Sequence, residues 1–132
     1  MKGKIYSISL FIWTSIVFAA ILMPQKDIIA KPRFLIEIPN IDKIVHVILF
    51  GVFTFLLACT LRANHFTKKK LYTISIALPI ALGFLTECLQ KIFFEYIMRT
   101  FDWMDISADI IGCFLALVIF YLLTAFSKAN KK

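Results

Sequence analysis

Residues 44–61, IVHVILFGVFTFLLACTL, decide the fold class of this chain. The segment contains no Asp, Glu, Lys or Arg across 18 residues. At about 1.5 Å per residue, a helix of this length covers most of the roughly 30 Å hydrocarbon core of a bilayer. The segment therefore predicts a transmembrane helix.

Three further apolar segments have a similar length, and they cover residues 5–23, 71–94 and 106–126. The chain is 61% hydrophobic, whereas soluble proteins average roughly 45–50%. We predict an all-α membrane protein with four transmembrane helices, forming one domain over residues 1–132. Pro79 should bend the third helix. The first segment could instead be a cleaved signal peptide, but its 19 residues exceed the usual apolar stretch of about 7–15.

The distribution of Lys and Arg predicts the orientation of these helices. One side of the membrane receives nine basic residues and the other receives six. The richer side holds both termini and the compact Lys68–Lys70 cluster. Because basic loops stay in the cytoplasm, we predict that both termini are cytoplasmic. The formal charge of +7 comes without a basic stripe of interleaved aromatics, so no nucleic-acid partner is expected.

Polar residues of three predicted helices converge at the outer ends of those helices. Pairs spaced by three or four residues share a helix face, as do Glu87 and Gln90 or Asp105 and Asp109. We predict a functional polar cluster, for ligand binding or chemistry, made of Asp42, Lys43, His46, Glu87, Gln90, Arg99, Asp102, Asp105 and Asp109.

Most members of this cluster also have a structural explanation. Asp42, Asp102 and Asp105 stand near helix starts, where a carboxylate caps free N–H groups. Glu87 and Asp109 are different because they lie inside apolar segments. A carboxylate at the centre of a membrane helix costs roughly 2.5–3.5 kcal/mol, so its presence favours a functional role.

The cluster combines five acids with two bases, a formal charge of −3 when His46 is neutral. Glu87 and Asp109 cannot both ionise in a low dielectric without compensation. A protonated carboxyl, a bound cation or a bridging Arg99 could each relieve them. We expect Arg99 to bridge the two, because a guanidinium can donate to two carboxylates at once.

Three motifs resemble those of the VanZ-like membrane proteins. Residues 42–46, DKIVH, resemble the family's D-K-x-x-H signature, and residues 83–90, GFLTECLQ, resemble G-x-x-x-E-x-x-Q. Residues 99–112, RTFDWMDISADIIG, resemble R-x-F-D-x-x-D-x-x-x-N-x-x-G, with Asp109 in place of the common Asn. The resemblance implies a multi-pass protein of the bacterial inner (cytoplasmic) membrane. The family's named member is associated with low-level resistance to the glycopeptide teicoplanin.

Two functions follow from the cluster and the resemblance. The first is a protein that binds a lipid-linked or cell-envelope ligand. Its expected partners are membrane lipids and either a lipid-linked cell-wall precursor or a glycopeptide. The alternative is a small intramembrane enzyme acting on a lipid or glycan headgroup, with Glu87 or His46 as acid or base. A third reading is an ion-coupled transporter. No serine–histidine signature occurs, which favours binding over catalysis. No zinc-type histidine spacing occurs either, and no metal or other cofactor is expected.

Overall fold

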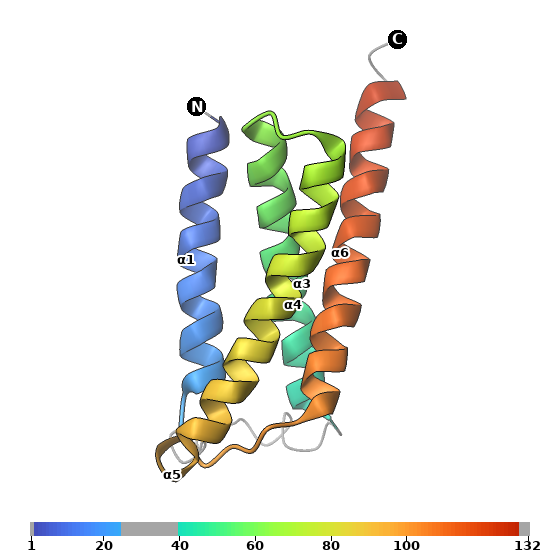
Figure 1. Ribbon diagram of the computed structural model, residues 1–132. Coiled ribbons are helices and arrows are strands. Elements are labelled where there is room, and N and C mark those ends of the chain that lie inside the picture. The colour runs from blue at the N-terminus through green and yellow to red at the C-terminus, as the bar shows by residue number, and fades with distance from the viewer. Residues whose placement is uncertain (1, 25–39, 130–132) are drawn as a thin grey trace.

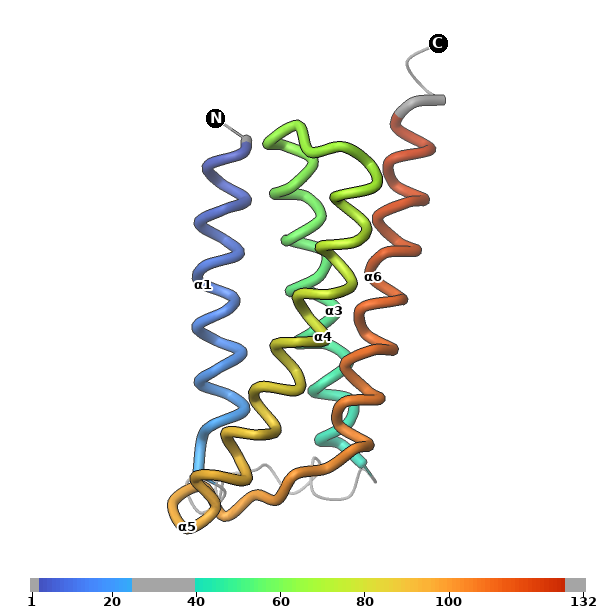
Figure 2. The backbone as a smooth tube through the Cα atoms, in the orientation of Figure 1, coloured from blue at the N-terminus to red at the C-terminus, as the bar shows by residue number. Residues whose placement is uncertain are grey.

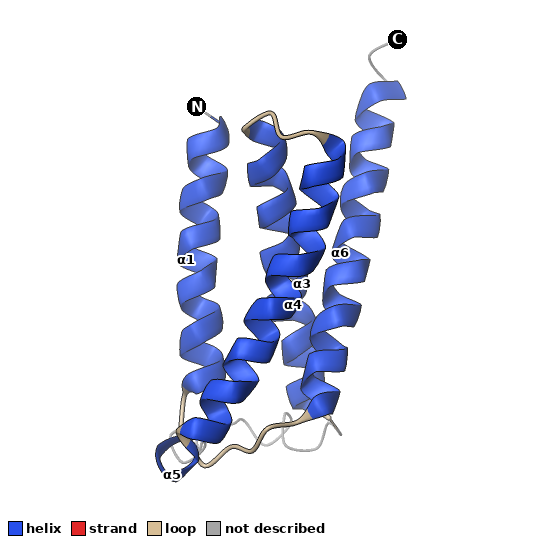
Figure 3. Ribbon diagram, in the orientation of Figure 1, coloured by secondary structure: helices blue, strands red, loops and turns tan. Residues whose placement is uncertain are grey.

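The computed structural model describes residues 2–24 and 40–129. Its helices are α1 (Lys2–Leu22), α3 (Ile41–Ala63), α4 (Lys68–Ile92), the single turn α5 (Phe94–Ile97) and α6 (Trp103–Ala129) (Figure 1). Within these residues 88% of the structure is helical and no strand occurs. Figure 3 shows these helices and the loops that join them. Four helices are long and apolar enough to cross a membrane. The predicted all-α fold with four spans is therefore confirmed.

The helices extend beyond most of the predicted apolar boundaries. The second predicted segment, 44–61, lies inside α3, which continues into polar residues at both ends. Apolar composition marks the part of a helix that suits lipid, whereas backbone hydrogen bonds continue for as long as the φ/ψ angles permit. The third segment was predicted to end at residue 94, but α4 ends at Ile92 and a new turn begins at Phe94. Pro79 lies inside α4, as its place in the third segment predicted, and it is buried. The bend expected at this residue stays a prediction.

The four long helices run side by side, with α3 packed against α1, α4 and α6 (Figure 2). Both α3 and α6 begin at the end of the bundle where α5 lies, and both run away from it. The start of α1, the end of α6 and the turn between α3 and α4 lie at the opposite end. The predicted cytoplasmic segments thus share one end of the molecule.

Glycines allow α3 and α6 to approach each other closely. A Cβ atom on Gly112 would lie 2.3 Å from the carbonyl oxygen of Val47, and one on Gly51 would lie 3.3 Å from the carbonyl oxygen of Gly112. At Gly112 only a residue without a side chain fits such a contact between helix backbones, whereas a methyl group at Gly51 would be a tight fit. These two glycines therefore bring the two helices together.

The outer surface of the bundle is apolar. Phe11, Phe114 and Phe126 are among the large hydrophobic side chains that are at least two-thirds exposed. Exposed apolar surface on this scale is unfavourable in water and natural in lipid. The core consists of two clusters of buried side chains. One contains Phe53, Leu57, Ala58, Leu61, Leu71, Leu117 and Phe120, and the other Val17, Ile21, Leu49, Phe50 and Cys113.

The membrane orientation stays a prediction, and cysteine labelling in intact cells tests it. We expect a membrane-impermeant thiol reagent to label Thr100→Cys but not Thr67→Cys, because the basic residues around Thr67 should remain in the cytoplasm. Both positions are exposed loop residues. The test uses a chain whose native Cys59, Cys88 and Cys113 are replaced by alanine. Labelling of Thr67→Cys but not of Thr100→Cys would show that the orientation is opposite to the predicted one.

Candidate functional site

The first turns of α3 and α6 form a ladder of charged side chains. Lys43 and His46 are one turn apart on α3, and Asp105 and Asp109 are one turn apart on α6, so each pair shares a helix face. Because the two helices run in the same direction, Lys43 meets Asp105 at one level and His46 meets Asp109 at the next. The sequence predicted that these residues converge, and the structure brings them together.

Lys43 is the centre of the outer level. Its ammonium group forms ion pairs with Asp102, with Asp105 and, at 3.1 Å, with Asp42. An ammonium has three N–H donors, so three carboxylates match its full capacity. Asp102 also caps α6, since its Oδ1 accepts a hydrogen bond of 2.8 Å from the Met104 N–H. The Lys43 ammonium and this N–H together hold the pKa of Asp102 below its ordinary value.

His46 and Asp109 form the inner level, which is fully enclosed. The His46 side chain is 3% exposed and that of Asp109 is 0% exposed. Nδ1 of His46 lies 2.8 Å from Oδ1 of Asp109, and Nε2 lies 3.7 Å from Oδ2 of Asp105. The bond to Asp109 fixes the orientation of the ring and points its second nitrogen at Asp105. The imidazole also lies parallel to the Phe50 ring.

Glu87 brings α4 into the same cluster. The residue is fully buried, and its Oε2 accepts a hydrogen bond of 2.9 Å from the Asp102 N–H. Its Oε1 has no hydrogen-bond partner among the residues that the structure describes, and Oδ2 of Asp109 has none either. Two buried carboxylate oxygens therefore lack compensation from the described part of the chain, which is costly in a low dielectric.

The remaining predicted members have different positions. Gln90 is buried and donates a hydrogen bond of 2.9 Å to the carbonyl oxygen of Ile21, so it ties α4 to the end of α1. Asp42 is half exposed at the rim and contacts Lys43. Asn40, and not Asp42, occupies the position before the first turn of α3.

The expected bridge by Arg99 is also wrong. Arg99 forms no ion pair with a carboxylate within residues 2–24 and 40–129. His46 makes the contact with Asp109 that we expected Arg99 to supply, and the Asp102 N–H makes the one with Glu87. The physical reason is position, since Arg99 follows the left-handed residue Met98 in the loop after α5 rather than lying on a helix face of the bundle.

A polar cavity of about 370 Å³ adjoins the cluster. Arg99, Asp102 and Asp105 line it, so its inner wall is shared with the buried ladder. The other lining residues are Ile41, Asp42, Gln90, Met98 and Thr100.

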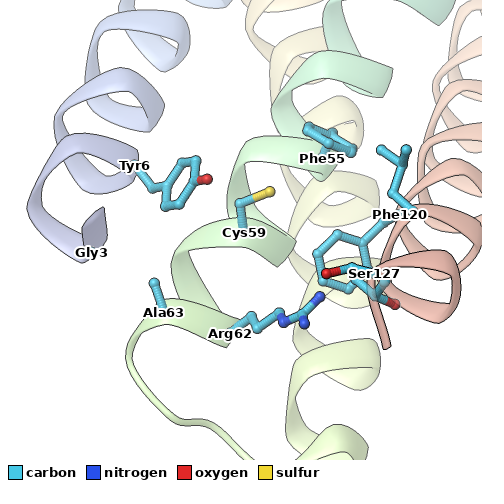
Figure 4. A pocket seen from close by; sticks show the side chains of 10 residues that line it. Gly3, Tyr6, Phe55, Cys59, Arg62, Ala63, Phe120 and Ser127 are labelled. Atoms are coloured by element: carbon cyan, nitrogen blue, oxygen red, sulfur yellow. The ribbon is translucent and has the colours of Figure 1, made fainter. Parts of the chain in front are cut away.

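A larger cavity of about 760 Å³ lies at the opposite end of the bundle, between α1, α3 and α6 (Figure 4). Arg62 is the charged residue among those that line it, and its guanidinium lies 5.9 Å from the centre of the Phe120 ring. Its lining contains no set of converging acids and bases. By size alone this cavity would be the candidate ligand site. Converging charged side chains line the smaller cavity instead, and this chemistry makes the smaller one the better candidate.

Comparison with known proteins agrees with the arrangement of these motifs. The chain matches the family model described as VanZ/LLP1 over residues 4–124. It belongs to the VanZ/LLP1 family. The match includes all of α3 and α4, most of α1 and α6, and all nine residues of the predicted cluster. No curated protein and no solved structure matched the chain.

Two contributions to this VanZ/LLP1 site were not evident from the sequence. Gly83 is one: a Cβ atom there would lie 2.4 Å from Oδ2 of Asp109. The other is the backbone, since the Asp102 N–H and the Ile21 carbonyl bind Glu87 and Gln90. The motif at residues 83–90 contains this glycine one turn before Glu87, but its partner on α6 could not be identified without the tertiary contacts.

The contact between Gly83 and Asp109 predicts an energetic coupling. Gly83→Ala should destabilise the protein because the new methyl group displaces the Asp109 carboxylate from His46. In Asp109→Ala the displaced oxygen is absent. Gly83→Ala made in that background should therefore lower the free energy of unfolding by about 0.5–3 kcal/mol less than it does in the parent, the range of coupling for residues in contact. Thermal unfolding of the four proteins in detergent measures this difference.

Gly3→Ala is the matched control, because a Cβ atom at Gly3 meets no heavy atom closer than 3.7 Å. We expect this variant to unfold like the parent protein. Equal behaviour of Gly83→Ala and Gly3→Ala would contradict the proposed contact.

Proposed function

We propose that this VanZ/LLP1 protein binds a lipid-linked or cell-envelope ligand on the outer side of the bacterial inner membrane. The observation that carries the proposal is the polar cavity lined by Arg99, Asp102 and Asp105 at the end of an apolar bundle. By the family resemblance, such binding would affect susceptibility to glycopeptides of the teicoplanin type.

The cavity offers one basic side chain to an anionic group and three acidic side chains to hydroxyl or ammonium groups. Arg99 is partly buried and forms no ion pair within the described residues. Its guanidinium can therefore receive a phosphate or carboxylate through two parallel hydrogen bonds. Asp42 and Asp102 lie on the same lining and can accept hydrogen bonds from hydroxyl or ammonium groups.

The position of the cavity suits a ligand held by a lipid. The aromatic side chains of Phe94, Tyr96 and Trp103 are exposed on the segments beside it, and such rings commonly lie at the headgroup level of a bilayer. A lipid-linked ligand would keep its chain along the apolar bundle and present its polar head at this level. The proposal needs no movement of the buried ladder.

Replacement of Arg99 tests the proposal. We expect Arg99→Ala to weaken binding of a radiolabelled polyprenyl-diphosphate-linked cell-wall precursor by roughly tenfold or more, because a charged hydrogen bond contributes about 1.5–3 kcal/mol. Arg99→Lys should also be impaired, since an ammonium cannot supply the two-pronged contact. Binding is measured with the purified chain in lipid nanodiscs.

Arg62→Ala is the control, because Arg62 lines the cavity at the other end of the bundle. It should bind like the unmodified chain. If Arg99→Ala also binds normally, Arg99 does not hold the ligand. If no precursor binds to the unmodified chain, the proposed ligand class is wrong.

An intramembrane enzyme is the second candidate, and the His46–Asp109 pair favours it. A histidine oriented by a buried carboxylate can act as a general base. Glu87 supplies a second titratable group at the same level, and its Oε1 has no hydrogen-bond partner among residues 2–24 and 40–129. Turnover of the labelled precursor by purified protein distinguishes this candidate from a protein that only binds.

Glu87→Gln separates a chemical role of Glu87 from a structural one. The amide oxygen of Gln can still accept the Asp102 N–H, so the fold should persist while the charge is lost. We expect Glu87→Gln and Glu87→Ala both to abolish function, with both variants still inserted in the membrane. Only Glu87→Ala should lower stability, by about 1–3 kcal/mol, because it leaves a backbone donor unpaired. Full function of Glu87→Gln, measured as precursor binding or turnover, would limit Glu87 to a structural role.

A further inference from the structure

Three side chains from three helices present ligand atoms to one point. His46 of α3, Glu87 of α4 and Asp105 of α6 each offer one nitrogen or oxygen, and these three atoms lie within 4.8 Å of one another. All three residues are buried. A buried set of one imidazole and two carboxylates is a common donor set for a divalent transition metal.

The distance between His46 and Asp105 favours a shared cation. The 3.7 Å between Nε2 and Oδ2 is longer than a direct N–H···O hydrogen bond, which spans about 2.7–3.2 Å. Two ligands that each lie about 2.1 Å from one metal in tetrahedral geometry are separated by roughly 3.4 Å. The observed distance therefore leaves room for a metal ion between the two atoms.

The hydrogen bond made by the other ring nitrogen, Nδ1, supports a metal site independently of these distances. Nδ1 of His46 bonds Oδ1 of Asp109 at 2.8 Å. A histidine that binds a metal through one ring nitrogen commonly donates the N–H of the other to a carboxylate. This bond fixes the tautomer, so that the metal-facing nitrogen keeps its lone pair. With the proton on Nδ1, Nε2 faces the Asp105 carboxylate with a lone pair, and a positive species between them would stabilise both.

Glu87 adds a further reason for a ligand at this point. Its side chain is fully buried and reaches the other two ligand atoms, yet Oε1 accepts no hydrogen bond from the described residues. Lys43 is already shared among Asp42, Asp102 and Asp105. A divalent cation would supply the charge that this cluster of acids lacks.

We propose that His46, Glu87 and Asp105 bind one divalent first-row transition metal such as Zn²⁺. Asp109 orients the His46 ring through its hydrogen bond to Nδ1. Three protein ligands would leave a coordination position for water or for a ligand in the adjoining cavity. Asp105 lines that cavity, which provides a path for the ion. The inference deepens the proposed function by giving the same site an electrophile, but metal binding does not depend on the identity of the envelope ligand.

Zinc titration of the full chain in detergent tests the site. The protein is stripped with EDTA, exchanged into chelator-free buffer, titrated with Zn²⁺ by calorimetry and analysed for bound metal by mass spectrometry. We expect one Zn²⁺ per chain and weaker binding of Mg²⁺, which prefers an all-oxygen octahedral shell. His46→Gln and Asp105→Asn should lose this site. His65→Gln is the control, because His65 is exposed in the turn between α3 and α4.

Asp109→Asn keeps the test decisive if the ligand variants fold poorly. The Asn oxygen can still accept from Nδ1–H, so the variant should retain one Zn²⁺ but bind it about 10–100-fold more weakly, as loss of an orienting carboxylate does elsewhere. Helical circular dichroism and gel filtration check the fold of each variant. Absence of stoichiometric Zn²⁺ in the unmodified chain, unchanged binding by His46→Gln, or an unchanged affinity in Asp109→Asn would each overturn the inference.

The two proposals for this site can fail separately. Zn²⁺ binding is measured without any envelope ligand, and Arg99→Ala should leave it unchanged. Precursor binding is measured both with Zn²⁺ and with EDTA. Retained metal with no precursor binding rejects only the proposed ligand, and precursor binding without a metal site rejects only the metal.

Discussion

The pairing of basic groups on α3 with carboxylates on α6 is the constraint on which the rest of this structure depends. An ionised carboxylate inside an apolar bundle has no water to stabilise it, so the protein itself has to supply positive charge or hydrogen bonds. Lys43 and His46 supply both to Asp105 and Asp109. This requirement fixes the rotation of the two helices, because a different rotation would leave the acids facing lipid.

The close approach of the helices follows from the same pairing. Side chains as short as Asp reach a histidine only if the helix backbones come near each other, and Gly112 permits this against the Val47 carbonyl. Gly83 then leaves the space that the Asp109 carboxylate occupies. The small residues and the charged residues are therefore parts of one arrangement, and the exposed apolar faces of the helices are left for lipid.

The cluster has a buried part and an open part with different chemical capacities. The open part contains Arg99 and Asp102 on the wall of a polar cavity, where a solvated headgroup can enter. The buried part holds His46, Glu87 and Asp109 away from solvent, where a fixed geometry can hold a proton or a metal ion. Asp105 belongs to both parts, so an occupant of the cavity would lie next to the buried groups.

The sequence by itself determined the four apolar helices, the single end that collects the polar residues, and the family, because hydrophobicity and spacing along a helix are local properties. It also identified Glu87 and Asp109 as residues too costly to lie in lipid without a reason. Only the tertiary structure decided which base meets which acid. Charge counting selected Arg99 for the buried acids because a guanidinium is the best bridge in principle. His46 contacts Asp109 instead, because it lies on the face of α3 that packs against α6, and the Asp102 N–H binds Glu87, whereas Arg99 lies in a loop. Partner choice depends on helix rotation and separation, and these are set by packing between segments far apart in the chain.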